Sequence, residues 1–175
     1  MLKPSLFIFT GVIFFTVNAF AFNNQNINAY IPNGKLVGTG QASIMFWDLY
    51  EASLFAPEGV FSQDKPFAIS LKYLMDIEGR EIADHSTKEM RRLGVSDEVK
   101  LATWHSQMDN LFPNVKEGNQ ITGIYTSDKR SIFYKDDHKI GEIKDPEFGH
   151  NFFRIWLDQK TELPTLRLKL IGATP

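Results

Sequence analysis

The sequence contains no cysteine among its 175 residues, which excludes disulfide bonds, thiolate metal ligands, cysteine nucleophiles and a lipid-anchored cysteine. It also lacks an excess of basic residues, because 19 Lys and Arg stand against 21 Asp and Glu. Proteins that bind nucleic acid normally carry a basic stripe, so we expect no nucleic-acid partner. Long hydrophobic runs are missing as well: the mainly apolar run at residues 5–17 is shorter than the ~20 residues that a membrane-spanning helix requires.

The run at residues 5–17 has the features of an export signal. Lys3 supplies a positive charge before it, its length falls within the ~7–15 residues of a signal-peptide core, and Ala-Phe-Ala at residues 19–21 suits a cleavage site. The alternative is an uncleaved membrane anchor. We expect an exported, periplasmic protein with no stable membrane span after cleavage. The chain then divides into a signal peptide at residues 1–21, a flexible leader rich in Asn at 22–34, and one domain at 35–173.

Hydrophobic periodicity in the domain predicts an α+β fold, an antiparallel sheet with helices packed on one face. Residues 44–50 are largely apolar on both alternating faces, which predicts a central strand. Phe67–Met75 alternates, which predicts a half-buried strand. Gly38 and Gly40 indicate a β-bulge or a close approach of another backbone. Further strands are expected at 120–126, 131–135 and 140–143, the last two joined by a turn at 136–139, and helices at 80–93 and after Ser96, Asp145 and Pro164.

Motifs for familiar chemistries are missing from the sequence. It has no Gly-x-Ser-x-Gly nucleophile elbow, no glycine-rich phosphate loop after a strand and no zinc-protease helix. His85 lies between Glu81 and Glu89 at helical spacing, but a metal site normally needs three or four ligands with supporting contacts. We therefore expect no metal site and no cofactor.

Aromatic residues are the positive signal. Trp47, Tyr50, Tyr73 and Trp104 come from strands and helices that should face each other. Such side chains either form an ordinary core or line an apolar cleft between the sheet and the helices. The residues alone leave both interpretations open.

Six segments carry a family resemblance: Leu36–Gly40 (LVGTG), Phe46–Pro57 (FWDLYEASLFAP), Pro66–Tyr73 (PFAISLKY), Glu89–Arg92 (EMRR), Leu111–Pro113 (LFP) and Phe152–Asp158 (FFRIWLD). In this order they resemble the bacterial chalcone isomerase-like proteins, from about Leu36 to Gly172. The resemblance implies an open-faced β-sandwich, a large antiparallel sheet with a helical layer. This agrees with the α+β fold that the periodicity predicts.

The resemblance does not imply that the activity is kept. The plant enzyme closes a chalcone with an Arg and a Thr from its strands and a Tyr and an Asn from the following helix, which stabilise phenolate and enolate. In this sequence Met45 stands at the Thr position, and no Arg occurs between Asn33 and Gly79. Ala83 and Met90 stand at the Tyr and Asn positions. We do not expect chalcone isomerase activity.

Three functions stay open. Some non-catalytic relatives bind fatty acids through an Arg and a Tyr, so the first is a binding protein for a small apolar or fatty-acid-like ligand. The strand Arg of those relatives is missing here; Arg91 and Arg92 are either exposed charges at a helix end, which is the simpler interpretation, or substitutes for it. The second is an isomerase or lyase that uses Tyr50, Tyr73 and His85 as donors. The third is an envelope protein that binds a protein partner on its surface and no small ligand. The candidate ligand-binding residues are Trp47, Tyr50, Tyr73, His85, Arg91 and Trp104.

Overall fold

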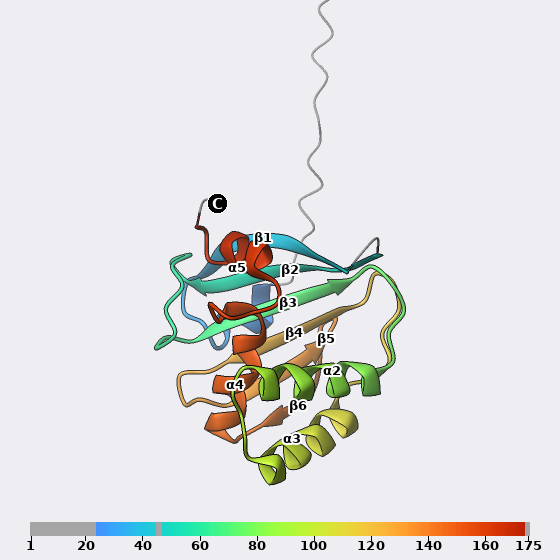
Figure 1. The fold of residues 1–175 in the computed structure, drawn as a ribbon. Coiled ribbons are helices and arrows are strands. Elements are labelled where there is room, and N and C mark those ends of the chain that lie inside the picture. The colour runs from blue at the N-terminus through green and yellow to red at the C-terminus, as the bar shows by residue number, and fades with distance from the viewer. Residues whose placement is uncertain (1–23, 45–46, 174–175) are drawn as a thin grey trace, which may run out of the picture.

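A computed structural model describes residues 24–44 and 47–173, and a six-stranded antiparallel sheet forms its centre (Figure 1). The strands lie side by side in chain order, and every neighbouring pair is antiparallel. The predicted signal peptide at residues 1–21 lies outside the described residues. The strands are β1 (Gly34–Ile44), β2 (Trp47–Pro57), β3 (Phe67–Tyr73), β4 (Gln120–Tyr125), β5 (Ser131–Lys135) and β6 (His138–Ile143).

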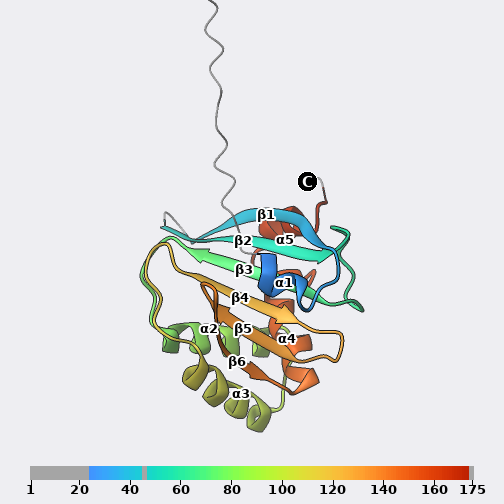
Figure 2. The same ribbon diagram turned by 180° about the vertical axis from the view of Figure 1, so that it is seen from behind.

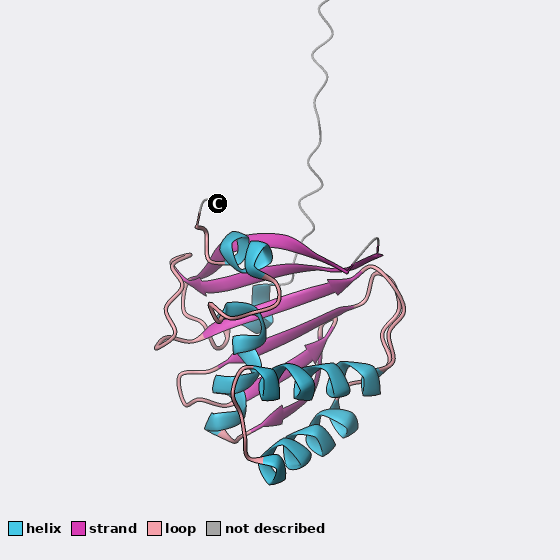
Figure 3. Ribbon diagram, viewed as in Figure 1, coloured by secondary structure: helices cyan, strands magenta, loops and turns pink. Residues whose placement is uncertain are grey.

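Four of the helices cover one face of this sheet (Figures 1 and 3). Two of them, α2 (Gly79–Arg92) and α3 (Glu98–Leu111), are inserted between β3 and β4, and α4 (Pro146–Leu157) and α5 (Pro164–Leu170) follow β6. The short helix α1 (Asn24–Asn28) lies on the opposite face (Figure 2). The α+β prediction is confirmed. None of the helices within the described ranges has the length and apolar character needed to cross a bilayer.

The main core fills the space between the sheet and the four helices. Phe67, Ile69 and Leu71 of β3 point toward the helices, because alternate residues of a strand share a face. On α4, Phe148 and Phe152 lie one turn apart and their rings stack, with centroids 5.2 Å apart. This layer of large apolar side chains holds the helices on the sheet and fixes the walls of the site described below.

The N-terminal segment covers the other face. Ile27 of α1 and Ile31 in the turn after it are fully buried, in a second cluster with Phe55 and Ile124 of the sheet. From residue 24 onward the structure thus differs from the flexible leader predicted at 22–34. The physical reason is that two isoleucines four residues apart give even an Asn-rich segment one apolar side to bury.

Strand β3 is consequently buried on both faces, and not half-buried as its alternation predicts. Ser70, on the face that α1 covers, is almost inaccessible, and its hydroxyl lies 3.0 Å from that of Thr122 on β4. Each hydroxyl supplies the hydrogen-bond partner that the other needs once water is excluded. The polar residue Ser70 in the alternating pattern of β3 is therefore a buried, hydrogen-bonded residue and not a solvent-exposed one.

The strand predicted through residues 44–50 is wrong. Strand β1 ends at Ile44 and β2 begins at Trp47, and these two residues are antiparallel partners. The side chain of Trp47 is 71% exposed, which does not suit a strand covered on both faces. No Gly or Pro marks the reversal in the sequence, so an apolar run that continues across it resembles one long strand.

Two further boundaries differ by small shifts. Asp97, and not Ser96, caps α3, with its carboxylate accepting hydrogen bonds from two backbone N–H groups of the first turn at 3.0 Å. Lys135 pairs with His138 across the β5–β6 hairpin, so the turn has two residues and not the four predicted. Its first residue, Asp136, has φ 52°, a conformation that Asp and Asn tolerate better than most residues.

Helix α5 lies directly on β1, and Gly38 makes this possible. A side-chain carbon at this position would lie 2.0 Å from the carbonyl oxygen of Lys169 in α5. The pairing of β1 with β2 also shifts register between Leu36 and Gly38. Both features predicted for the glycine pair, a bulge and a close backbone approach, are confirmed at this position.

Candidate functional site

A cavity of about 500 Å³ lies between the sheet and the helical layer. Strands β2, β3 and β4 form one wall, α2 and α4 form another, and the segment between α4 and α5 lies at its edge. Its volume falls within the range of small-molecule sites. Most of its lining is apolar: Leu49, Leu71, Ile77, Ile82, Phe112, Ile121, Phe152, Ile155, Trp156 and Leu163.

Two tyrosines bring hydroxyl groups into this apolar lining. Tyr50 on β2 and Tyr73 on β3 are direct cross-strand partners, and their rings meet edge to face with centroids 6.0 Å apart. The indole N–H of Trp156 on α4 donates to the Tyr50 oxygen at 2.9 Å. Neither tyrosine donates its own O–H to another described residue. Both protons are therefore available to a molecule in the cavity.

Burial keeps these two hydroxyls protonated. Loss of hydration raises the pKa of Tyr50 to about 12; the Trp156 hydrogen bond acts against this and the Glu89 carboxylate adds to it. Burial also raises the pKa of Tyr73, with a smaller contribution from Tyr50. The ionised form is disfavoured because it would lie in an apolar region. Both groups are neutral hydrogen-bond donors at physiological pH.

We expect the tyrosines to ionise in two stages as the pH is raised. The pKa of Tyr50 is higher in the folded protein than the ordinary value of 10. Its neutral hydroxyl therefore contributes fully to the free energy of unfolding below pH 10, and this contribution is lost as the pH rises toward 12. The ultraviolet absorbance of phenolate should therefore lag behind that of free tyrosine up to about pH 11. The remaining phenolate should appear together with unfolding, followed by circular dichroism. A titration complete at pH 10.5 in the folded protein would contradict the assignment.

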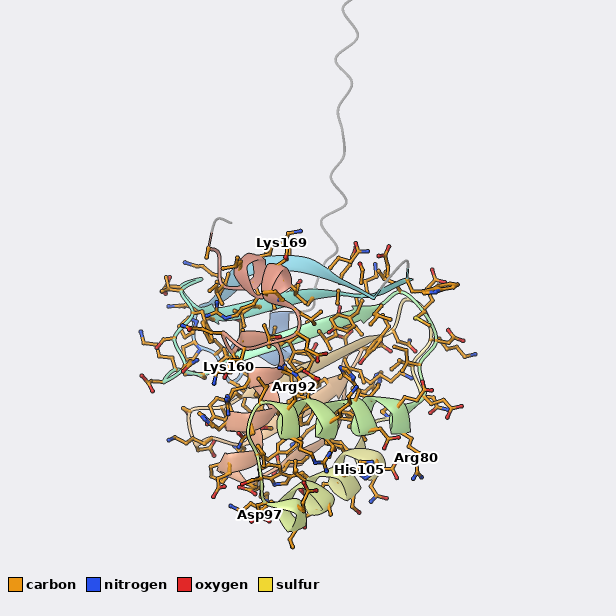
Figure 4. All side chains as sticks on the ribbon, in the orientation of Figure 1. Arg80, Arg92, Asp97, His105, Lys160 and Lys169 are labelled. Carbon is orange, nitrogen blue, oxygen red and sulfur yellow. The ribbon has the colours of Figure 1, made fainter. Side chains whose placement is uncertain are left out.

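An ion pair between a buried carboxylate and a partly exposed guanidinium lies beside the cavity. The Glu89 side chain is only 3% exposed, and the Arg92 guanidinium donates to its two oxygens at 2.9–3.2 Å. Arg92 also donates to the Lys160 carbonyl at 2.8 Å and lies 3.3 Å from the Glu162 carboxylate. Figure 4 shows Arg92 at the end of α2, with Lys160 in the segment that follows α4. Arg92 therefore links α2 to the segment at the edge of the cavity.

The structure brings three of the six candidate residues to the cavity. Tyr50 and Tyr73 lie on its sheet wall, and His85 lies on the α2 wall with its side chain partly in solvent. Glu89, considered in the sequence only as a neighbour of His85, also lines it. Groups of three or more His, Asp or Glu that could hold a metal ion do not occur in the parts of the chain that the structure describes.

The other three candidates lie elsewhere. Trp47 is at the exposed start of β2. Arg91 is not among the residues that line the cavity, and its guanidinium forms a two-pronged ion pair with Glu98 at 2.7–2.8 Å. Trp104 is buried in the core, where its indole N–H donates to Asp145 at 2.9 Å. Helical and strand periodicity predicted burial of such aromatic side chains but could not decide between core and cavity. The binding roles of all six residues remain predictions.

The residues matched to the enzyme's helix also lie away from the cavity. Ala83 and Met90 are fully buried in the core, while the side of α2 that lines the cavity carries Ile82, Ser86 and Glu89. Met45, at the position of the strand Thr, lies outside the described residues. A helix turns by about 100° per residue. A shift of one position in the alignment with the enzyme therefore decides whether the matched residue lies in the core or in the cavity lining.

An antiparallel sheet with one helical layer and an apolar cavity between them defines a class of open-faced sandwiches. The family described as chalcone isomerase-like matches residues 24–172. The chain belongs to this family, which confirms the resemblance seen in the sequence.

Two similar proteins extend this result. An uncharacterized protein of Haemophilus influenzae is 28% identical over 127 residues, which cover 72% of this chain and 62% of that protein; the chain thus spans less than two thirds of its length. The crystal structure of an Arabidopsis thaliana fatty-acid binding protein is similar with a TM-score of 0.61 and 11% identity, over 81% of this chain and 88% of that one. At this identity the likeness shows the fold alone.

Proposed function

We propose that this protein is exported and binds a small, mainly apolar molecule of the fatty-acid-like class in the cavity between the sheet and the helices. The apolar cavity carries the proposal. Cores are normally packed at nearly the density of organic crystals, so a cavity of this size with a mainly apolar lining departs from ordinary core packing and suits an apolar ligand. The fatty-acid binding named for the similar Arabidopsis protein supports the same class of ligand.

A non-catalytic role is the simpler use of this cavity. A general acid or base works best with a pKa near the operating pH, but burial moves the pKa of Tyr50 to about 12. The Glu89 carboxylate accepts hydrogen bonds from Arg92, so its oxygens are already engaged in an ion pair. The isomerase or lyase alternative keeps one favourable observation, since Tyr50, Tyr73 and His85 do meet at one cavity. Turnover of an added enone by the protein would favour that alternative.

The protein-partner alternative depends on the surface. Large apolar side chains that are well exposed come from different elements: Leu36 from β1, Trp47 from β2, Val60 from the segment after β2, and Val99 from α3. A partner surface needs such residues to be contiguous. The small-ligand proposal has a bounded apolar cavity as its site, whereas the partner alternative rests on these exposed side chains alone.

The proposal is tested on full-length protein expressed with its N-terminus and recovered from the periplasm. Native mass spectrometry should show a chain that lacks residues 1–21 and carries a bound small molecule, identified after solvent extraction. The uncharged fluorophore N-phenyl-1-naphthylamine should bind the delipidated protein saturably, at one equivalent per chain. A clean apo mass together with no saturable fluorophore binding would contradict ligand binding, and recovery of unprocessed protein in the cytoplasm would contradict export.

A further inference from the structure

The charged groups around the cavity are mostly acidic. Glu81, Glu89 and Glu162 line it, and the described lining residues include no Lys and no Arg. The basic residue in the described lining is His85, whose side chain is exposed at the edge of the cavity. A ligand carboxylate placed among the apolar side chains would lie beside these carboxylates, and its only basic neighbour in the described lining would be His85 at the exposed edge. Burying an unpaired charge in this way is strongly unfavourable.

The Arg92 guanidinium, which contacts two of these carboxylates, is already engaged. Arg92 directs its N–H groups to the Glu89 carboxylate and to the Lys160 carbonyl, and Glu162 lies 3.3 Å from its Nε. Moving the guanidinium toward a ligand would leave the buried Glu89 carboxylate unpaired. The free energy lost with the Arg92–Glu89 ion pair would offset the free energy gained from a new ion pair between Arg92 and the ligand, since one carboxylate would only replace another.

The cavity does offer hydrogen-bond donors. The Tyr50 oxygen accepts from Trp156, so its O–H is oriented for donation elsewhere, and the Tyr73 hydroxyl has no partner among the described residues. A carbonyl oxygen has two lone pairs and can accept from both phenols. An uncharged acceptor satisfies these donors without adding a fourth negative charge.

We infer that the ligand is an uncharged acyl ester or amide, whose carbonyl oxygen accepts hydrogen bonds from Tyr50 and Tyr73 and whose chain occupies the apolar part of the cavity. This inference rests on the proposed function and specifies the chemistry of the ligand's polar group. It distinguishes an acyl ester or amide from a free fatty acid, which carries a carboxylate at neutral pH.

The test compares three displacers of N-phenyl-1-naphthylamine that carry a twelve-carbon chain: 1-monolauroylglycerol (uncharged ester), laurate (anion) and dodecyltrimethylammonium (cation), at pH 7.5 and below their aggregation concentrations. The ester should bind at least about tenfold more tightly than laurate, the cost of an unpaired carboxylate. Equal or tighter binding of laurate or of the cation would overturn the inference while leaving the proposed function intact. Absence of saturable fluorophore binding would instead defeat the proposed function.

Two variants separate the hydrogen-bond and charge arguments. Tyr73→Phe removes one donor that has no partner in the fold and should weaken the ester about three- to tenfold, with little change for laurate. Glu81→Lys, at an exposed position of the lining, should strengthen the binding of laurate relative to that of the ester about threefold or more, with Glu81→Gln intermediate. Unchanged ester binding by Tyr73→Phe would overturn the assignment of the carbonyl to the tyrosines.

Discussion

Arg92→Met is expected to lower the free energy of unfolding by about 3 kcal/mol, because it leaves the buried Glu89 carboxylate without its partner. The value lies at the low end of the range for broken buried pairs, since the guanidinium is about one third exposed. The substitution also removes the hydrogen bond to the Lys160 carbonyl and the link to Glu162. Thermal unfolding followed by circular dichroism should show a midpoint lowered by on the order of 10 °C.

Two matched variants test the cause of this loss. Arg91→Met makes the same change one residue away, where the ion pair with Glu98 lies in solvent, and should leave the midpoint close to that of the parent. The double variant Arg92→Met with Glu89→Met should recover most of the stability, because apolar side chains of similar volume often replace a buried pair without loss. Equal unfolding temperatures for Arg92→Met and Arg91→Met would show that the Glu89 carboxylate does not depend on Arg92 for its stability in the folded protein.

Ser86→Trp is expected to abolish ligand binding, with an affinity for N-phenyl-1-naphthylamine reduced by about a hundredfold or more. Ser86 is buried on α2 and lines the cavity, so an indole at this position would occupy the space proposed for the ligand. The thermal midpoint of the variant should be no lower than that of the parent, because the indole would gain contacts with the apolar side chains that line the cavity. Fluorescence titration and thermal unfolding measure the two effects.

Ser106→Trp provides the control. It introduces the same side chain on a helix, α3, at a position that faces solvent, and should change neither binding nor the midpoint. Normal fluorophore binding by Ser86→Trp would place the binding site elsewhere on the chain. Loss of binding together with a much lower midpoint would be assigned to misfolding, and the smaller Ser86→Leu would then be used for the same comparison.

Local signals predicted much of this fold. Asp145 and Pro146 mark the start of α4, and the Asp145 carboxylate does accept the backbone N–H of Glu147 at 2.9 Å. The alternation on β3 placed Tyr73 on the helix side of the sheet, where it lies. These features depend on residues close together in sequence, which is why capping and periodicity reveal them.

Features that depend on distant segments could not be predicted in the same way. Ile27 is buried only because the far face of the sheet is available to it, and the Asn-rich residues around it indicate a leader. Glu89 and Arg92 look like ordinary charges at the end of an exposed helix. The contacts of Arg92 depend on the segment after α4, which lies some seventy residues further along the chain, and helical periodicity does not predict them.

The strictly sequential order of the sheet has a consequence for how the chain folds. Strands β1–β3 and β4–β6 each form a meander of neighbours, whereas residues 74–119 separate β3 from β4. Pairing across this seam closes the longest loop between adjacent strands and should be the slow, high-contact-order step. The cavity draws Tyr73 from the first meander and Ile121 and Trp156 from the second half. It exists only after the seam has closed, so a bound ligand would act mainly by slowing unfolding.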